Sequence, residues 1–486
     1  MPAFEAVIGL EVHAQLSTRT KLFCGCETTY GAAPNTQVCA TCLGLPGALP
    51  APNGAALALA ARAGFALGCT VARETRFDRK SYFYPDLPKG YQITQLALPL
   101  NEGGGLEVEF VEGARRIRLA RIHVEEDAAK STHEGSAGAT LVDFNRAGVP
   151  LVEIVSEPDL RSPAEAEAYL RQLRDVLLFA GVSDGSLEEG SFRCDANVSL
   201  RPVGTEPLGT RVELKNINSF RFVRDALAYE IRRQEALLGR GGRVEQETRS
   251  WDPERGESAP MRGKEDAEDY RYFPDPDLPP LALGEAWCAA RRAELPELPV
   301  ALRARLVAEL GLTEADAGVL GAHPALARYL EAAARSLAAA SGISLATAGK
   351  KTANVVQAEV LRDVQLRGHE ARFPVPAEAL AALLALVEAG TINGKIVKSV
   401  LPRMRDEGLD AETIVAREGL AQVSDRGAID ALVAEVIAAH PAQLAQYRSG
   451  KKAVFGFFIG QVMKRSGGTA NPGAVKDALH ATLDAE

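Results

Sequence analysis

A cluster of six prolines divides the chain of 486 residues into two parts whose apolar residues repeat at different intervals. Residues 1–290 contain short alternating segments, many glycines and turn signals, whereas residues 300–486 consist almost entirely of helical patterns. Proline has no backbone N–H donor and a fixed φ, so a dense group of prolines ends regular secondary structure. The six residues are Pro274, Pro276, Pro279, Pro280, Pro296 and Pro299. They predict a domain boundary near residue 295.

The helical part contains a second break. Pro374 and Pro376 separate two Ala- and Leu-rich runs, 324–340 and 376–389, that have helical periodicity. At about 100–200 residues per domain, a chain of this length accommodates roughly two to four domains. We predict three units, which comprise residues 1–294, 295–407 and 408–486.

Several segments of the first part alternate between apolar and polar residues, as expected for half-buried β-strands. In the first of them, Ile8, Leu10, Val12, Ala14 and Leu16 alternate with Glu11, His13 and Gln15. The same pattern recurs at residues 120–127, 192–200 and 211–215. Helical runs at 54–66 and 163–180 would cover the apolar face of the sheet. The sequence therefore predicts an α+β domain with an antiparallel sheet.

The polar positions of these strands admit two interpretations. An antiparallel sheet with one hydrated face explains the alternation without any functional site. Here, however, carboxylates, a histidine and a few cations recur on strand after strand, a composition that favours a charged catalytic face. Glu153 stands alone inside the apolar run VPLVEIV, where an ionised carboxylate requires a partner.

Four of the seven cysteines form two close pairs, Cys24 with Cys26 and Cys39 with Cys42. Four thiolates in two such pairs can surround a tetrahedral Zn²⁺ and leave no open position, so the predicted zinc is structural. The alternative is four unrelated buried thiols. The isolated cysteines, which we predict to be core residues, are Cys69, Cys194 and Cys288.

A second metal site, with oxygen ligands suited to a hard cation, is predicted from Glu11, His13, Glu125 and Glu153. Carboxylate oxygens suit Mg²⁺, which keeps some of its waters and bridges to substrate phosphates. Without a cation, crowded carboxylates would raise one another's pKa values. A lone histidine on a strand is more often structural, but His13 lies two residues after Glu11 and on the same side.

The segment RKSYFYPDLPKGY at residues 79–91 is a candidate phosphate-binding loop, because it supplies Lys80, Lys89, aromatic rings and a glycine. A surface loop would have a similar composition. The sequence contains neither G-x-x-x-x-G-K-[ST] nor G-x-G-x-x-G, which excludes a P-loop and a dinucleotide-binding fingerprint.

The chain carries a formal net charge of −9, yet its last part is basic. Residues 441–486 contain six Lys or Arg against three Asp or Glu, a net +3, which leaves −12 for residues 1–440. Arg448, Lys451, Lys452, Lys464 and Arg465 lie in a stretch without acids, which suits contact with a polyanion. The sequence has no secretion signal and no apolar run of about 18 residues, so we expect a cytoplasmic protein without membrane contact.

Several long motifs, in the same order, resemble the GatB/GatE family, to which the B subunits of aspartyl/glutamyl-tRNA amidotransferases belong. These motifs are GLEVHAQL, TKLFCGC, VCATCLGLPGALP, KSYFYPDLPKGYQITQ, RIHVEEDAAK, DFNRAGVPLVEIVSEPD, SFRCDANVSL, VELKNINSFRFV and DYRYFPDPDLPPL. The segment KKAVFGFFIGQVMKRSGGTANP resembles the tail domain that this family shares with YqeY-like proteins. Ala40 and Thr41 depart from the commoner Pro-Val between the second cysteine pair and leave the ligands untouched. The chain has no room for the inserted domain of the E-type branch, so the resemblance is to the B type.

The resemblance implies a fold and a reaction. The fold is an N-terminal catalytic cradle with a glutamine synthetase-like antiparallel sheet, followed by an all-α helical domain and a YqeY-like tail that binds tRNA. In the reaction, the side-chain carboxylate of Glu-tRNA(Gln) or Asp-tRNA(Asn) is phosphorylated by ATP, and ammonia then gives Gln-tRNA(Gln) or Asn-tRNA(Asn). The implied cofactors are ATP, Mg²⁺ and structural Zn²⁺.

The resemblance also implies roles for individual residues. Glu11, His13, Glu125 and Glu153 would bind the magnesium ion, and the four paired cysteines the zinc ion. The implied catalytic residues are Glu125, Asp195, Glu213 and Lys215, and the implied cofactor-binding residues are Lys80, Tyr82, Lys89 and Arg193. Asp195 and Glu213 would orient water or receive a proton from ammonia, while the cations would hold phosphates or the substrate carboxylate.

No glutaminase site is visible in this sequence, so ammonia would come from a glutaminase, the A subunit of the family's complex, which also contains a small C subunit. The cognate non-discriminating aminoacyl-tRNA synthetase is a further expected partner. Two alternatives stay open. A free-standing ATP-dependent ligase would act without partners, and a tRNA-binding zinc module without catalysis of its own would explain the cysteines and the basic tail but not the acidic strands.

Overall fold

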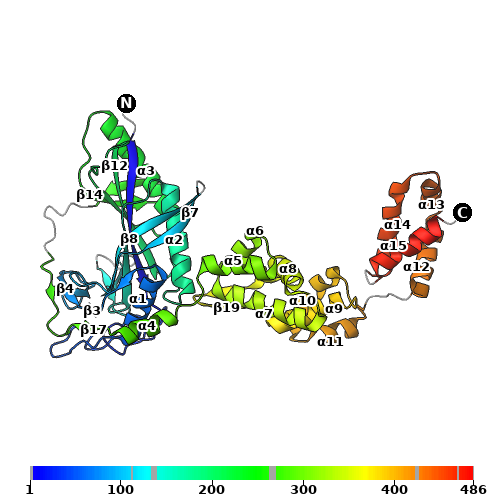
Figure 1. Ribbon diagram of the computed structural model, residues 1–486, viewed down its shortest axis with the longest axis horizontal. Coiled ribbons are helices and arrows are strands. Elements are labelled where there is room, and N and C mark those ends of the chain that lie inside the picture. Colours follow the sequence, from blue (N-terminus) through cyan, green and yellow to red (C-terminus); the bar gives the residue numbers. More distant parts are fainter. Residues whose placement is uncertain are drawn as a thin grey trace. The chain divides into compact units, whose positions relative to one another are not determined.

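The computed structural model describes residues 4–110, 113–132, 139–261, 270–421, 426–467 and 470–484. The chain divides into two compact units, Met1–Pro299 and Val300–Glu486. The first unit is a mixed α/β domain and the second is helical, so the predicted change of fold after the proline cluster is observed (Figure 1).

A ten-stranded sheet forms the centre of the first unit, in the order β15-β14-β13-β12-β1-β11-β8-β6-β2, with β7 also paired to β8. The strands of this sheet are β1 (Phe4–Gln15), β2 (Thr70–Val71), β6 (Asn101–Glu102), β7 (Gly105–Phe110), β8 (Gly113–Glu126), β11 (Pro150–Ser156), β12 (Phe192–Pro202), β13 (Val212–Lys215), β14 (Glu247–Asp252) and β15 (Glu257–Pro260). The prediction of an antiparallel sheet is correct for its central strands. It is wrong for β13 and β14, which pair in parallel because helix α3 connects them as a crossover.

The alternation of β1 is reproduced in the structure. Its even-numbered apolar residues from Ile8 to Ala14 are at most 1% exposed, whereas Glu11 and His13 are only partly buried. The same division holds for β12, where Cys194, Ala196 and Val198 are buried. The sheet therefore has one dry face and one face that carries charged side chains, as the period of two predicts.

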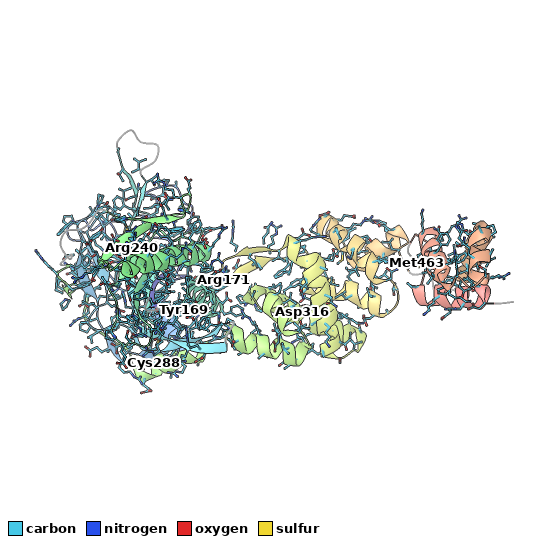
Figure 2. The ribbon with its side chains drawn as sticks, turned by 90° about the horizontal axis from the view of Figure 1, so that it is seen from above. Tyr169, Arg171, Arg240, Cys288, Asp316 and Met463 are labelled. Carbon is cyan, nitrogen blue, oxygen red and sulfur yellow. The ribbon has the colours of Figure 1, made fainter. Side chains whose placement is uncertain are left out.

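Three helices supply apolar residues to the core on the dry face of the sheet: α1 (Gly54–Ala66), α2 (Pro163–Phe179) and α3 (Phe220–Gly239). Their first turns are defined by the sequence, because the side chains of Asn53, Ser162 and Ser219 accept hydrogen bonds from the first backbone N–H groups. Tyr169 of α2 is fully buried in this core (Figure 2). Cys69, Cys194 and Cys288 are also buried in this core, which confirms the prediction that these three cysteines are core residues.

Small sheets and one short helix complete the first unit. They are the sheet of β16 (Phe273–Pro274), β4 (Asp78–Ser81) and β5 (Tyr91–Thr94), the pair β3 (Glu74–Thr75) and β17 (Leu281–Ala282), the pair β9 (Lys130–Thr132) and β10 (Leu141–Asp143), and α4 (Glu285–Ala293). The three-stranded sheet is attached to the large one, since Thr94 Oγ1 donates to Glu125 Oε2 at 3.1 Å.

The second unit consists of helices and one short hairpin. Its elements are α5 (Pro299–Leu310), α6 (Glu314–Leu320), α7 (Pro324–Ser341), α8 (Leu345–Val355), the π-helical turn Val356–Val360, the 3₁₀ turn Leu361–Asp363, β18 (Gln365–Arg367), β19 (Glu370–Arg372), α9 (Ala377–Glu388), α10 (Gly394–Glu407), α11 (Ala411–Glu418), α12 (Arg426–Ala439), α13 (Pro441–Arg448), the 3₁₀ turn Lys452–Val454, α14 (Phe455–Arg465) and α15 (Pro472–Leu483). Helices α12 to α15 bury an apolar cluster of their own, centred on Val433, Phe458 and Leu479.

Among the described residues, no single helix is long and apolar enough to cross a membrane. Only the pair α12 and α13, which is bent by 94°, reaches the required length and composition jointly. Val433, Val436 and Tyr447 of this pair are buried in the apolar cluster of the tail.

Candidate functional site

The charged face of the sheet brings four residues into one row. In the strand register, His123 of β8 lies opposite Glu153 of β11, Glu153 opposite His13 of β1, and His13 opposite Arg193 of β12. Directly opposed residues on one face of an antiparallel sheet have neighbouring side chains. Residues that are up to 180 positions apart in the sequence, as His13 and Arg193 are, therefore meet at one site.

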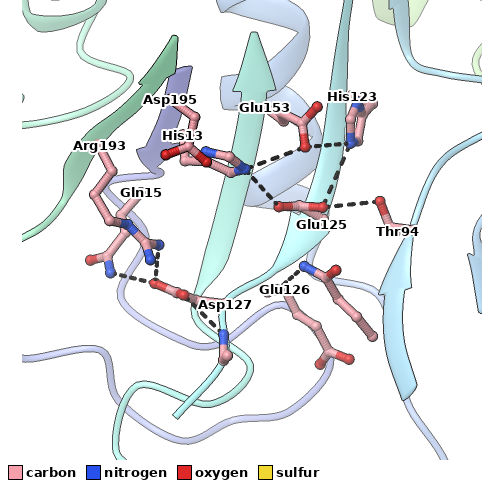
Figure 3. A network of polar contacts seen from close by, with 12 residues as sticks. His13, Gln15, Thr94, His123, Glu125, Glu126, Asp127, Glu153, Arg193 and Asp195 are labelled. Atoms are coloured by element: carbon pink, nitrogen blue, oxygen red, sulfur yellow. Dashed lines mark hydrogen bonds and ion pairs between the residues drawn. The ribbon is translucent and has the colours of Figure 1, made fainter. Parts of the chain in front are cut away.

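Two histidines and two glutamates form the centre of this site (Figure 3). His13 Nε2 lies 3.3 Å from Glu153 Oε2 and 3.7 Å from Glu125 Oε1. His123 Nε2 lies 3.6 Å from both Glu125 Oε2 and Glu153 Oε2. Arg121 Nη2 is 3.7 Å from Glu153 Oε1, so the isolated glutamate has the cationic partners that its burial requires.

Three of the four residues predicted to bind magnesium lie together. One ligand atom each of His13, Glu125 and Glu153 falls in a group whose members are all within 4.8 Å of one another. Two carboxylates suit Mg²⁺, whereas imidazole is a less usual ligand for this ion, so the donor set fits a divalent cation that completes its shell with oxygen from water or phosphate. Glu11 is not in this group, and its Oε1 accepts a hydrogen bond from Asn197 Nδ2 at 3.0 Å.

The surroundings of Glu11 are strongly negative. Burial raises the pKa of its carboxyl group, and the charges of Glu153, Glu213 and Asp195 raise it further. Carboxylates that crowd in this way disfavour ionisation unless a cation offsets them. The acidic face is therefore suited to a ligand that brings positive charge, such as a metal–nucleotide complex.

The negative charges of this face raise the pKa of His13 and thereby stabilise its protonated form. Burial lowers its pKa, but the hydrogen bond with Glu153 and the charges of Glu125 and Glu153 outweigh burial and raise the pKa to about 8. The same contacts, together with His123 and Arg121, lower the pKa of Glu153 to about 2 although burial raises it. In the metal-free protein His13 and Glu153 therefore form an ion pair at neutral pH.

This ion pair predicts a pH dependence of stability. A histidine whose pKa is raised from 6.5 to about 8 on folding stabilises the native state fully below pH 6.5 and loses that contribution as the pH rises through 8. Cys42, whose pKa is lowered on folding, contributes a pH dependence of the opposite sign in the metal-free protein, so the prediction concerns the difference between the wild type and His13→Gln. The free energy of unfolding of the wild type, relative to that of His13→Gln, should fall by roughly 2 kcal/mol between pH 6 and pH 9. Denaturant titrations of both proteins in a chelator measure this difference, and an equal change with pH in both proteins would contradict the assignment.

Lys215 and two carboxylates extend the site across the next strands. Lys215 Nζ lies 2.7 Å from Asp195 Oδ2 and 3.2 Å from Glu213 Oε1. Burial lowers the pKa of Lys215, but the two carboxylates raise it well above its ordinary value. Glu213 also accepts a hydrogen bond from Thr248 at 2.8 Å. The structure thus brings these three predicted residues together, with the lysine charged.

Arg193 is fixed at the other end of the row. Its Nη2 lies 2.8 Å from Asp127 Oδ2, which also accepts a hydrogen bond from Gln15 Nε2 at 2.9 Å (Figure 3). Arg146 Nε lies 3.6 Å from the same oxygen. The guanidinium group therefore has a defined orientation beside His13.

The three predicted residues of the loop at residues 79–91 contact partners other than His13, Glu125 and Glu153. Lys89 pairs with Glu126, whose side chain leaves β8 on the side opposite to Glu125. Lys80 Nζ lies 4.6 Å from the ring centroid of Tyr270, and the Tyr82 ring contacts Tyr270 and Tyr84. The structure thus places Lys80 and Tyr82 in an aromatic cluster and Lys89 in a separate ion pair.

The two cysteine pairs converge as predicted. The four Sγ atoms of Cys24, Cys26, Cys39 and Cys42 lie within 4.8 Å of one another. The Sγ atoms of Cys39 and Cys42 are 3.9 Å apart, close to the edge of about 3.8 Å of a tetrahedron with Zn–S distances of 2.3 Å. The residues present therefore fit a tetrahedral zinc ion.

The cysteine site contains a thiol poised to ionise. The hydrogen bond from Cys24, the backbone N–H of Cys39 and the charge of Lys21 lower the pKa of Cys42 to about 4, although burial raises it. Lys21 is fully buried, and its Nζ lies 3.7 Å from Cys42 Sγ and 3.1 Å from the carbonyl oxygen of Phe144. A buried ammonium group at this position offsets the negative charge of the thiolates.

A pocket of about 230 Å³ adjoins the acidic face. Val7, Gly9, Val155, Pro158 and Leu208 line it together with Glu11 and Asn197. Gly9 lies two residues before Glu11 on β1, on the same face of the strand. The absence of a side chain at Gly9 leaves room for a flat apolar group next to the acidic cluster.

Sequence reasoning did not assign several residues of the site. Arg121, His123 and Asp127 share the parity of Glu125, so the alternation itself contained the signal. Lys21 could not be found in this way, because its contact with Cys42 depends on the path of the cysteine loop.

The chain matches two family models, the GatB/GatE catalytic domain over residues 6–289 and the GatB domain over residues 341–483. Among curated relatives named as B subunits of aspartyl/glutamyl-tRNA(Asn/Gln) amidotransferase, that of Geobacter sp. (strain M21) is 52% identical over 98% of both chains. Those of Anaeromyxobacter sp. (strain Fw109-5) and Alkalilimnicola ehrlichii are 52% and 51% identical over 99% of each chain. This chain belongs to the GatB/GatE family.

Proposed function

We propose that the chain is the B subunit of a cytoplasmic tRNA-dependent amidotransferase, an ATP-dependent ligase of protein biosynthesis. It would convert Glu-tRNA(Gln), Asp-tRNA(Asn) or both to the amidated forms. Its partners would be the charged tRNA and the other two subunits of the enzyme, the glutaminase (A) and the small C subunit, with the non-discriminating synthetase as a further partner. The observation that carries the proposal is the row His123–Glu153–His13–Arg193 on the charged face of the sheet.

In the first step, a side-chain carboxylate oxygen of the charged tRNA attacks the γ-phosphorus of ATP. The bond to the β–γ bridging oxygen breaks, ADP leaves, and an acyl phosphate forms. The difficulty is the repulsion between a carboxylate and a triphosphate, which nearby cations reduce. Arg193 and Lys215 are two cations of this face that are held in place by carboxylates, and we assign them to the phosphates and the substrate carboxylate.

In the second step, ammonia attacks the acyl carbon and inorganic phosphate leaves. The nitrogen must then lose a proton to a nearby base. Asp195 and Glu213, which flank Lys215, are assigned to this proton transfer.

His13, Glu125 and Glu153, with Glu11 nearby, would hold Mg²⁺, which would neutralise charge on the triphosphate. The purine of ATP would occupy the pocket beside Gly9, from which the phosphates would reach Glu11 and His13. The four cysteines would hold a structural zinc ion, since their set leaves no open position. The glutamine synthetase-like character of the sheet and the division into units 1–294, 295–407 and 408–486 are part of the same proposal.

The test is incubation of the chain, with and without the glutaminase and the small C subunit, with misacylated tRNA, ATP and either glutamine or ammonium. We expect amidated tRNA from ammonium with the chain present, and from glutamine only when the glutaminase is present as well. Activity with glutamine from the chain alone would favour a free-standing ligase. Binding of tRNA without ATP cleavage in any combination would favour a zinc-containing tRNA-binding module.

The basic tail predicts a separable contribution to tRNA affinity. Lys452 Nζ lies 3.1 Å from Asp484 and Arg465 Nη2 lies 3.0 Å from Glu435, so acids already offset these two cations. Within the described part of the chain, Lys451 and Lys464 have no such acidic partner. Changing both to glutamine should raise the KM for charged tRNA and reduce the salt slope of binding by about one for each lost phosphate contact.

The matched control is the double variant Lys452→Gln and Arg465→Gln, which removes the same charge from paired positions and should have the smaller effect on the salt slope. Binding of tRNA is measured between low and physiological salt for both variants. Unchanged tRNA affinity of the Lys451 and Lys464 variant, together with a collapsed kcat, would contradict a binding role of the tail.

A further inference from the structure

Exposed aromatic rings gather beside the acidic face, on two segments that are far apart in the sequence. We call Tyr82, Phe83, Tyr84, Tyr270 and Tyr272 the aromatic platform. Phe83 is 87% exposed, Tyr84 54% and Tyr272 38%. Large apolar rings that are this exposed and close together are typical of a binding surface.

The platform is an ordered structure and not a collection of separate rings. The backbone N–H of Ser81 donates to the carbonyl oxygen of Tyr270 at 2.9 Å, which joins the two segments. Ring centroids are 5.8 Å apart for Tyr82 and Tyr84, 6.2 Å for Tyr82 and Tyr270, and 6.0 Å for Tyr270 and Tyr272. Gly90, at φ +75°, lies so close to Phe83 that a Cβ atom there would be 3.4 Å from the ring.

The platform is continuous with the proposed catalytic site. Lys80 lies opposite Gln92 in the β4–β5 register, and Thr94 of the same strand donates to Glu125. The first ring of this segment, Tyr82, lies at the level of Gly90, since its backbone N–H donates to the carbonyl oxygen of Gly90 at 3.1 Å. Four residues of strand separate Gly90 from Thr94 and correspond to about 13 Å, so the rings begin about that far from the level of Thr94 and Glu125. Tyr272 reaches the same region, since Glu125 and Glu153, after burial, raise its pKa to about 12.

We propose that the exposed rings of Phe83, Tyr84 and Tyr272 stack on unpaired bases at the 3′ end of the charged tRNA, and that Lys80 contacts the adjoining phosphate. Single-stranded nucleic acid is held by aromatic rings on which bases stack, combined with cations for the backbone. The inference rests on the proposed function, because the amino acid is esterified to the terminal nucleotide. When its side chain is at Glu125, that nucleotide must lie within a few ångströms of the acidic face.

A purine could also come from ATP, but two observations favour the tRNA. The pocket beside Gly9 is a recess of about 230 Å³ directly against Glu11, whereas the platform consists of several exposed rings that could hold more than one base. In addition, the ammonium group of Lys80 lies over the Tyr270 ring, 4.6 Å from its centroid, so a cation accompanies the rings. This arrangement suits a chain of nucleotides that runs toward the site.

The test is a thermodynamic cycle that combines variants of the platform with tRNA whose 3′ end is intact or trimmed. One variant combines Phe83→Ala with Tyr84→Ala, and a second combines Phe83→Tyr with Tyr84→Phe and keeps both rings. Val203→Ala, at a residue that is 59% exposed, is the control for loss of surface area. Each is assembled into the complete three-subunit enzyme, and the affinity for deacylated tRNA is measured with an intact 3′ end and with the last three nucleotides removed.

The wild-type complex should bind intact tRNA about five- to 150-fold more tightly than trimmed tRNA for each stacked base. The alanine variant should lose this preference, whereas the ring-retaining variant and Val203→Ala should keep it. The KM for ATP should stay within about twofold of the wild type for all variants, and the KM for charged tRNA should rise only for the alanine variant.

A preference for intact tRNA that survives in the alanine variant would overturn the proposal, as would a raised KM for ATP with unchanged tRNA binding, which would assign the rings to the nucleotide. A different result would show that the proposed function itself is wrong. The wild-type complex would then not amidate charged tRNA at all, whatever the binding cycle gives.

Discussion

Replacement of Glu125 by glutamine is expected to lower tRNA-dependent ATP cleavage and amidation together, by about 10²–10³-fold. Glutamine keeps the size of the side chain but removes the charge that a cation at His13, Glu125 and Glu153 requires. It also places an amide near His13 and His123, which now lie 3.7 and 3.6 Å from the carboxylate oxygens. The loss should fall on the phosphorylation step, which precedes amidation.

One preparation of the assembled complex, assayed three ways, tests this expectation. Phosphate release, glutamate release and amidated tRNA are measured with the same misacylated tRNA. Basal glutamine hydrolysis should survive, because it takes place on the glutaminase, and tRNA binding should persist. Glu107→Gln is the matched control, since Glu107 is an exposed glutamate of the same large sheet.

Two results would change the role of Glu125. Normal phosphate release with only amidation lost would move it from metal binding to the ammonia step. Full activity in all three assays would remove it from the site. Unfolding of the variant is measured alongside, because Glu125 is buried and bonded to Thr94.

The faces of the strands could be predicted from the sequence because alternation is a local property. In β1, parity alone separates buried Leu10 and Val12 from Glu11 and His13. The register between strands is not local. That His13 faces Glu153 on one side and Arg193 on the other depends on loops and pairings that no period of two encodes. The members of the acidic face could therefore be named from the sequence, and three of the four residues predicted to bind magnesium lie together, but the strand register that brings them together could not be derived.

Lys89 shows the same limit of a local pattern. Its role as a phosphate-binding cation is predicted from composition, and composition does not say which carboxylate of β8 is its partner. The difference of one residue between Glu125 and Glu126 places Lys89 on the opposite side of the strand. The parallel pairing of β13 with β14 was missed for a related reason, because a short strand has the same pattern in either direction.

The cysteine site gives the second large expected effect. Changing Cys39 and Cys42 to serine should remove about one equivalent of zinc per chain and lower the free energy of unfolding by several kcal/mol. The pKa of Cys42 is lowered to about 4, and loss of this thiol would also leave the fully buried ammonium group of Lys21 without its negative partner. An unpaired buried charge is costly, so the effect should exceed that of the lost metal bonds alone.

Three measurements separate the zinc ion from the cysteines themselves. Metal analysis gives the zinc content, and unfolding is followed with and without a chelator. The chelator should lower the free energy of unfolding of the wild type toward that of the double variant and leave the double variant unchanged. The reason is that a metal ion that binds only the native state stabilises that state by mass action. Cys288→Ser is the matched control, since this buried cysteine lies outside the four-cysteine group and should leave zinc content intact. A zinc-free wild-type protein whose unfolding equals that of the double variant would exclude a structural metal, and the four thiols would then be ordinary buried cysteines.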